Sequence, residues 1–283
     1  MLLTAFIRTA TAGAVAAIAF AGWTDGIGLP GMELRPAQDN SGAPVVDAEL
    51  VLAVDVSYSM DQEEQVLQRE GYMRGITSRE FLQALRGGMT GKVALTYFEW
   101  AGPYDQKIIV PWRLIDGPEA ADAFADEIAR GPYRRASRTS ISGALSFAKP
   151  LFAESGFHGL RRVIDVSGDG ANNAGQIVTM ARDDVLAAGI IINGLPIMLK
   201  RPSLFTMDIE NLDVYYEDCV IGGPGSFVVP IHEREQFKEA TRTKLVQEVA
   251  DGAPDPAVVP VQIRKPRISC TVGEQMWRDR WGN

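Results

Sequence analysis

Two short apolar segments, far apart in the chain, each lead into an aspartate, and this pairing constrains the fold more than any other feature. Residues 50–54 (Leu-Val-Leu-Ala-Val) run directly into Asp55, and residues 162–166 (Arg-Val-Ile-Asp-Val) are followed closely by Asp169. Short apolar runs rich in β-branched residues are typical of buried strands. Because ligands of an open α/β sheet bind at the carboxyl ends of its strands, we expect both carboxylates at one functional edge.

Hydroxyl side chains accompany these two carboxylates. Ser57 and Ser59 follow Asp55 at alternate positions, and Thr139 begins the segment Thr-Ser-Ile-Ser-Gly-Ala-Leu. Two carboxylates and three hydroxyls make an all-oxygen ligand set, which suits a hard divalent cation such as Mg2+ and not zinc or copper. The alternative is that these residues cap helices, because loops between strands and helices favour the same side chains.

The pattern resembles the metal-ion-dependent adhesion site (MIDAS) of von Willebrand factor A (vWA) domains. That site is formed by Asp-x-Ser-x-Ser, a distant Thr, and an Asp that is usually followed by Gly. All five positions occur here in the same order: Asp55, Ser57, Ser59, Thr139 and Asp169. Residues 165–173 and 215–228 resemble, more narrowly, a bacterial family of exported vWA-like proteins catalogued as a domain of unknown function, DUF1194. The resemblance extends from about residue 46 to residue 270.

The resemblance implies a site for Mg2+ or Mn2+. The three hydroxyls would bind the metal directly, and the two carboxylates would hold it partly through water. Mostly neutral ligands leave the cation electron-poor, so it would accept a carboxylate from a partner protein that the sequence does not identify. Asn172 and Asn173 follow the third loop, where they either orient water at the site or simply form a turn.

The order of expected elements favours an α/β fold. The turn at residues 101–103 makes residues 92–100 and 107–113 a hairpin, so one edge strand is antiparallel. The prediction is a doubly wound, mostly parallel, Rossmann-like sheet with helices on both faces. Strands are expected at 49–56, 92–100, 107–113, 162–167, 190–197 and 227–231, and helices at 61–86 (interrupted near 71–77), 118–129, 142–152, 175–188 and 234–249.

The N-terminus predicts export. Arg8 precedes a small apolar run that ends in Ala19-Phe20-Ala21, so residues 1–21 are predicted to be a cleaved signal peptide. Residues 22–45 are then a linker, 46–250 the vWA-like domain and 251–283 a C-terminal tail. We expect a periplasmic or secreted protein without stable membrane insertion after cleavage. The alternatives are an uncleaved anchor and a buried N-terminal helix.

The cysteines and the net charge limit the partners and the metal chemistry. Cys219 and Cys270 are the two cysteines, and in an oxidising compartment an even pair is predicted to be bridged, the alternative being two buried thiols. Without nearby histidines they cannot form a structural zinc site. The formal net charge of −8 disfavours nucleic acid and anionic lipid as partners. Trp277 and Trp281 either pack on the domain or form an aromatic patch for a partner.

Enzymatic interpretations lack the residues that they need. A phosphatase with an aspartate nucleophile carries a second Asp where this chain has Ser57, and no Gly-x-Ser-x-Gly motif marks a serine nucleophile. His158 and His232 have no evident catalytic partner, and residues 222–226 lack the Lys of a phosphate-binding loop.

The sequence therefore predicts an exported vWA-like module that binds a protein partner through a metal completed by the partner's carboxylate, and no enzyme. Two alternatives stay open. One is a Mg2+-dependent hydrolase of phosphate esters, and the other is a structural periplasmic module with a vestigial site.

Overall fold

Five strands form one sheet in the order β3-β2-β1-β4-β5. The computed structural model describes residues 42–200, 208–250 and 267–282. β1 pairs in parallel with β2 and β4, and β4 pairs in parallel with β5, whereas β2 and β3 are antiparallel. The mostly parallel sheet with one antiparallel edge strand is thereby confirmed. The strands are β1 (Val45–Asp55), β2 (Val93–Trp100), β3 (Gln106–Ile115), β4 (His158–Gly168) and β5 (Ile191–Pro196).

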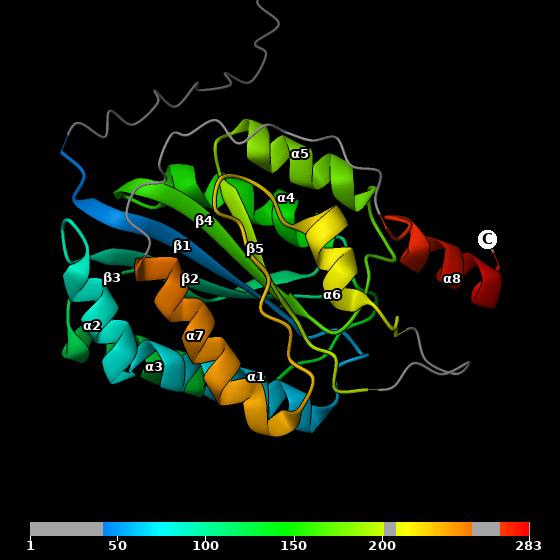
Figure 1. Cartoon of the computed structure of the whole chain (residues 1–283), viewed down its shortest axis with the longest axis horizontal. Helices are drawn as coiled ribbons and strands as arrows, with labels where there is room; N and C mark the ends of the chain where they lie inside the picture. Colours follow the sequence, from blue (N-terminus) through cyan, green and yellow to red (C-terminus); the bar gives the residue numbers. More distant parts are fainter. Residues whose placement is uncertain (1–41, 201–207, 251–266, 283) are drawn as a thin grey trace, which may run out of the picture. The chain divides into compact units, whose positions relative to one another are not determined.

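Helices cover both faces of this sheet (Figure 1). The side chains of β1 alternate between two apolar cores, with Leu50 and Leu52 in one and Val51 and Ala53 in the other. This burial on both faces explains why the run that precedes Asp55 is continuously apolar. The first core is covered by α1 (Gln62–Ile76), α2 (Arg79–Gly87), α3 (Pro118–Arg130) and α7 (Phe237–Ala250), and the second by α4 (Ile141–Leu151), α5 (Val178–Ala187) and α6 (Leu212–Tyr215).

The last predicted strand, residues 227–231, is wrong as a strand. This segment follows β5 through isolated parallel bridges from Val228 to Gly194 and from Ile231 to Ile197. The Val229 and Ile231 N–H groups donate to the carbonyls of Gly194 and Pro196, but Pro196 has no N–H to return a bond. The Phe227 N–H bonds to the side-chain oxygen of Asn193 instead of a backbone carbonyl. The ladder therefore stays discontinuous, and the sheet ends at β5.

The predicted break in the helical segment 61–86 occurs after Ile76, at the C-terminal end of the range 71–77. α1 continues through Gly71 and Gly75 and ends at Ile76, and Ser78 caps α2 by accepting from the Phe81 N–H. The two glycines serve packing against α7. A Cβ at Gly75 would lie 2.6 Å from Leu245 Cδ1, and one at Gly71 would lie 2.8 Å from Thr241 Oγ1.

A buried ionic cluster also fixes α7 against the sheet. The fully buried Lys244 ammonium lies 2.7 Å from Asp165 Oδ1 and 2.6 Å from Glu248 Oε1. Asn193 Nδ2 donates to the other oxygen of Glu248 at 2.8 Å. Burial raises the pKa of Asp165 to about 6, against the opposing effect of the Lys244 charge. Since an unpaired charge here would be costly, the cluster favours one register of α7.

Some predicted segments lie outside the described residues. These are the signal peptide, the linker up to residue 41, and the first part of the tail, residues 251–266. In the ranges that are described, no helix has both the length and the apolar character that a bilayer span requires.

We expect Gly75→Ala to lower the free energy of unfolding by about 1 to 3 kcal/mol, because its Cβ would overlap the buried Leu245 side chain. Urea denaturation measures this. Gly87→Ala in α2 is the matched control, because a Cβ there meets nothing within 4 Å and alanine favours helix. Equal stability of the Gly75→Ala variant and the wild type would contradict the packing explanation.

Candidate metal site

Three loops at the carboxyl edge of the sheet carry the predicted ligands, and backbone contacts join them. The first loop follows β1, the second precedes α4 and the third follows β4. A parallel bridge pairs Ser57 with Ala136, which connects the first loop to the second. The Asn173 N–H donates to the Thr139 carbonyl at 2.8 Å, which connects the third loop to the second.

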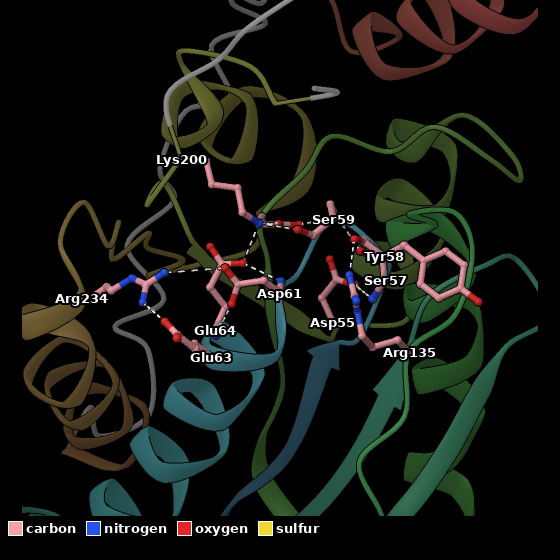
Figure 2. A network of polar contacts seen from close by, with 11 residues as sticks. Asp55, Ser57, Tyr58, Ser59, Asp61, Glu63, Glu64, Arg135, Lys200 and Arg234 are labelled. Carbon is pink, nitrogen blue, oxygen red and sulfur yellow. Dashed lines mark hydrogen bonds and ion pairs between the residues drawn. The ribbon is translucent and has the colours of Figure 1, made fainter. Parts of the chain in front are cut away.

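A chain of hydrogen bonds runs from Asp55 to Asp169. The Ser57 N–H donates to Asp55 Oδ1 at 2.7 Å, and the hydroxyls of Ser57 and Ser59 lie 2.7 Å apart. Ser59 Oγ in turn donates to Asp169 Oδ1 at 2.6 Å. Figure 2 shows Asp55, Ser57 and Ser59 directed toward one another from the loop that follows β1. The structure therefore brings four of the five predicted residues into one network.

Thr139, the fifth predicted residue, lies at the same site because it lines a cavity there. Its N–H donates to Asn173 Oδ1 at 3.0 Å, and a Cβ at Gly170 would lie 3.7 Å from the Thr139 hydroxyl. Thr139 lines a cavity of about 400 Å³ together with Ser57 and Ser59. All three hydroxyls thus line one hollow at the carboxyl edge.

The two carboxylates are buried and repel each other. Burial raises the pKa of Asp55 well above its ordinary value, and the charge of Asp169 raises it further. Burial also raises the pKa of Asp169 to about 6, although the nearby Lys200 ammonium opposes the rise. Within the described part of the chain, Asp55 Oδ2 is buried without a hydrogen-bond partner. A cation would compensate such an oxygen, so the residues present fit a divalent metal.

Lys200 is the site residue that sequence reasoning missed. Its ammonium donates to Glu64 Oε2 at 2.5 Å, to Asp169 Oδ2 at 3.0 Å and to the Ser59 carbonyl. Figure 2 shows it reaching the site from the side opposite Tyr58. The available signal was its position shortly after β5, at the same edge of the sheet. Lys200 therefore acts as a tethered positive charge against the third loop.

Carboxylates, thiolates and imidazoles do not by themselves form a cluster of ligands at this edge in the described residues. Among residues 42–200, 208–250 and 267–282, no three His, Cys, Asp or Glu side chains are grouped so that they could hold a metal. The five predicted residues offer two carboxylates and three hydroxyls, a donor set that matches a hard cation.

The C-terminal helix α8 (Val272–Trp281) closes one side of the cavity. Asn172 Nδ2 donates to Glu274 Oε1 at 2.7 Å, and the backbone of Asn172 approaches Gly273 so closely that a Cβ there would overlap its carbonyl oxygen. The Arg138 guanidinium stacks 3.3 Å from the centre of the Trp277 ring. Trp277 therefore packs on the domain and lines the cavity, whereas Trp281 is largely exposed.

The Asn pair has a structural role in this arrangement. Asn172 Oδ1 accepts from the Ser142 N–H at 2.9 Å while its amide group binds Glu274, so the side chain connects α4 to α8. Asn173 holds the backbone of Thr139. The amide oxygens of both residues accept from backbone N–H groups, and no turn forms at this pair.

A disulfide links Cys219 and Cys270. Cys219 lies in a π-helical turn, Tyr216–Val220, that packs in the second core, and Cys270 immediately precedes α8. The Arg267 guanidinium pairs with Asp218 on the same turn. These contacts attach the helix that closes the cavity to the body of the domain.

The two histidines lie away from this chemistry. His158 begins β4, at the opposite end of that strand from Asp169, and it is exposed. His232 is also exposed, and neither histidine lines the cavity. The site therefore has no imidazole base next to its hydroxyls.

The chain has a vWA-like fold, with the Asp-x-Ser-x-Ser, Thr and Asp residues at the carboxyl edge of a mostly parallel sheet. The chain belongs to the family described as "Protein of unknown function (DUF1194)", whose model matches residues 45–253. The predicted family and the vWA-like fold are confirmed, and the match ends at residue 253, short of the predicted residue 270. A comparison with curated proteins gives no match.

Similar solved structures support the fold. Proximal thread matrix protein 1 from the mussel byssus has a TM-score of 0.55 at 13% identity, over 73% of this chain and 49% of that chain. A form of that protein with a zinc-occupied MIDAS motif has a TM-score of 0.50 at 14% identity, over 74% of this chain and 49% of that chain. The pilus adhesin SpaC from Lactobacillus rhamnosus GG has a TM-score of 0.54 at 11% identity, over 74% and 31%. The chain thus spans half or less of these proteins, and the likeness is one of fold alone.

Reduction of the disulfide is expected to destabilise the protein by up to about 4 kcal/mol, because the bridge closes a loop of 51 residues in the unfolded chain. Thermal unfolding with and without reductant measures the loss, and Cys219→Ser with Cys270→Ser should reproduce it. Thiols that react with an alkylating reagent in unfolded, unreduced protein would show that the bridge is absent.

Proposed function

We propose that this protein is an exported vWA-like module that binds a protein partner through a divalent cation, Mg2+ or Mn2+. The observation that carries the proposal is the unpartnered, buried Asp55 Oδ2 beside hydroxyls that line one cavity. A carboxylate oxygen in that condition is stabilised by a cation. The zinc-occupied MIDAS motif of a structure with the same fold supports a divalent metal in such a site.

Each residue has a distinct role in this proposal. The hydroxyls of Ser57, Ser59 and Thr139 would bind the cation as neutral ligands, and Asp55 and Asp169 would supply the negative charge. The chemistry that the cation supplies is a strong attraction for one carboxylate of the partner. The cavity provides the space for that group beside the hydroxyls.

The lack of an imidazole near the site, among the described residues, argues against hydrolysis. Turnover of a phosphate ester needs a group to activate water, and neither histidine lines the cavity. Lys200 favours a different second candidate, a structural module with a vestigial site, because its ammonium already pairs with Asp169. The two proposals differ in whether an added metal binds.

Export and domain organisation form part of the proposal. A signal peptide at residues 1–21, a linker at 22–45, a domain at 46–250 and a tail at 251–283 would place the protein in the periplasm or outside the cell. The disulfide supports this location, since such bonds persist in oxidising compartments. The net charge of −8 supports a protein partner over nucleic acid or anionic lipid.

We expect saturating Mg2+ or Mn2+ to raise the melting temperature, because a ligand that binds only the native state stabilises it. At a concentration of about one hundred times Kd the gain is about 2.7 kcal/mol, which is several degrees for a domain of this size. Differential scanning calorimetry with and without a chelator measures the shift.

Two variants separate metal binding from the vestigial alternative. Asp169→Ala should abolish the shift. Lys200→Met should melt at a lower temperature without metal, because Asp169 and Glu64 lose their shared cation, and should show a larger shift with metal, because the ammonium no longer competes. If added metal leaves the melting temperature of both the wild type and Lys200→Met unchanged, the site is vestigial.

Partner capture should depend on the same residues. In pull-downs from periplasmic extract, wild-type protein should capture a partner in the presence of Mg2+. A chelator, Asp55→Ala or Thr139→Ala should each abolish this capture, because a cation that lacks one of its ligands cannot hold the partner's carboxylate. Thr139→Ser keeps the hydroxyl and should retain most of the capture. Mg2+-dependent turnover of a phosphate ester by the wild type, lost in Asp55→Ala, would replace this proposal with the hydrolase.

A further inference from the structure

The cavity beside the metal site is bordered by arginines that have no acidic partner. Arg138 and Arg280 line it, and Arg135 lies over the ring of Tyr58, which also lines it. Within the described ranges, none of these three forms an ion pair or a hydrogen bond with a carboxylate. Other arginines of the same domain are paired, as Arg69 is with Glu99.

This border is unusual on a chain with a net charge of −8. Lys200 also lines the cavity, but Glu64 and Asp169 balance its charge. Asp208 is the one acidic residue in the cavity lining, and among the described residues it forms no ion pair with Arg138 or Arg280. The acidic protein therefore presents an excess of positive charge where a ligand would approach the site.

The Arg138 side chain is held in place before any ligand arrives. The central carbon of its guanidinium stands 3.3 Å from the centre of the Trp277 ring, and a guanidinium stacked on a ring keeps N–H donors for an anion. Its backbone has a φ of 77°, a left-handed conformation that is costly for a residue with a side chain. Thr139, a predicted metal ligand, follows directly in the chain, so the two groups are positioned together.

α8 brings the second guanidinium to the same cavity. Trp277 and Arg280 are three residues apart, so they lie on one face of this helix. The helix is fixed to the metal-site loops by Glu274 and Asn172 and to the core by the disulfide. Arg138 and Arg280 therefore approach one hollow from two rigidly attached elements.

We propose that Arg138, Arg280 and Trp277 form an anion subsite beside the metal position, so that the partner is an acidic protein segment with two carboxylates. One carboxylate would complete the metal, and the second would bind the guanidinium groups. The role of the first carboxylate rests on the proposed function. The binding site of the second carboxylate is inferred from the two arginines. Because a guanidinium binds a carboxylate through two parallel hydrogen bonds, the spacing of the two acids sets the specificity.

The experiment uses synthetic peptides with blocked ends and a fixed central Glu in a Ser/Gly background. A second Glu is placed in turn at each nearby position, and a Gln at that position gives the matched neutral peptide. Binding to the full mature protein is measured by fluorescence anisotropy in Mg2+ or Mn2+. At the best spacing, the second Glu should tighten binding about tenfold over Gln.

Substitutions assign that gain to the arginines. Arg138→Gln and Arg280→Gln should each remove most of it, while leaving the affinity for the peptide with one Glu and the metal-induced rise in melting temperature unchanged. Arg280 is exposed, so its substitution tests the subsite without risk to folding. Arg278→Gln is the matched control, because it removes the same charge from an exposed position of α8 that does not line the cavity.

The outcomes distinguish this inference from the proposed function. Metal-dependent binding of the peptide with one Glu, without a gain from a second Glu at any position, overturns the subsite and keeps the metal function. A gain that persists when both arginines are replaced also overturns the subsite. Binding that survives a chelator and Asp169→Ala but is lost with both arginines keeps the subsite and overturns metal-dependent capture. If no acidic peptide binds, both proposals fail.

Discussion

The parallel pairing of β1 with β4 is the constraint on which the site depends. Val54 lies opposite Ser167 in this ladder, so the chain leaves both strands at one edge and delivers Asp55 and Asp169 to the same place. A slip of one residue would turn the side chains of β4 to the opposite faces and expose its apolar set. The two cores that β1 separates make such a slip costly, and the register of the carboxylates follows from apolar burial.

The charges at this edge are arranged in two layers. Two buried carboxylates lie inside, held by hydroxyls, backbone N–H groups and the Lys200 ammonium. Arginines and aromatic rings lie around the cavity outside them. Buried negative charge attracts a cation and the outer positive charge attracts an anion, so the arrangement suits a metal bridged to an acidic ligand.

Most of the fold was predictable because burial dictates it locally. The apolar runs, the hairpin turn and the order of strands and helices each depend on near neighbours, and the sheet confirms them. The predictions failed where contacts between residues distant in the sequence determine the local structure. Gly75 lies inside α1, where α7 packs against it. Residues 227–231 form no strand because Pro196 has no N–H to donate to them and the Phe227 N–H bonds to the Asn193 side chain.

The sequence by itself determined the sheet, its carboxyl edge and the five residues collected there, since each of those residues lies at or within a few positions of the end of a regular element. Only the tertiary structure decided what surrounds them. Lys200, Arg138 and Trp277 lie on separate segments whose meeting depends on loop paths, on the docking of α8 and on the disulfide. No local pattern encodes such contacts, because their geometry is set by how whole elements pack.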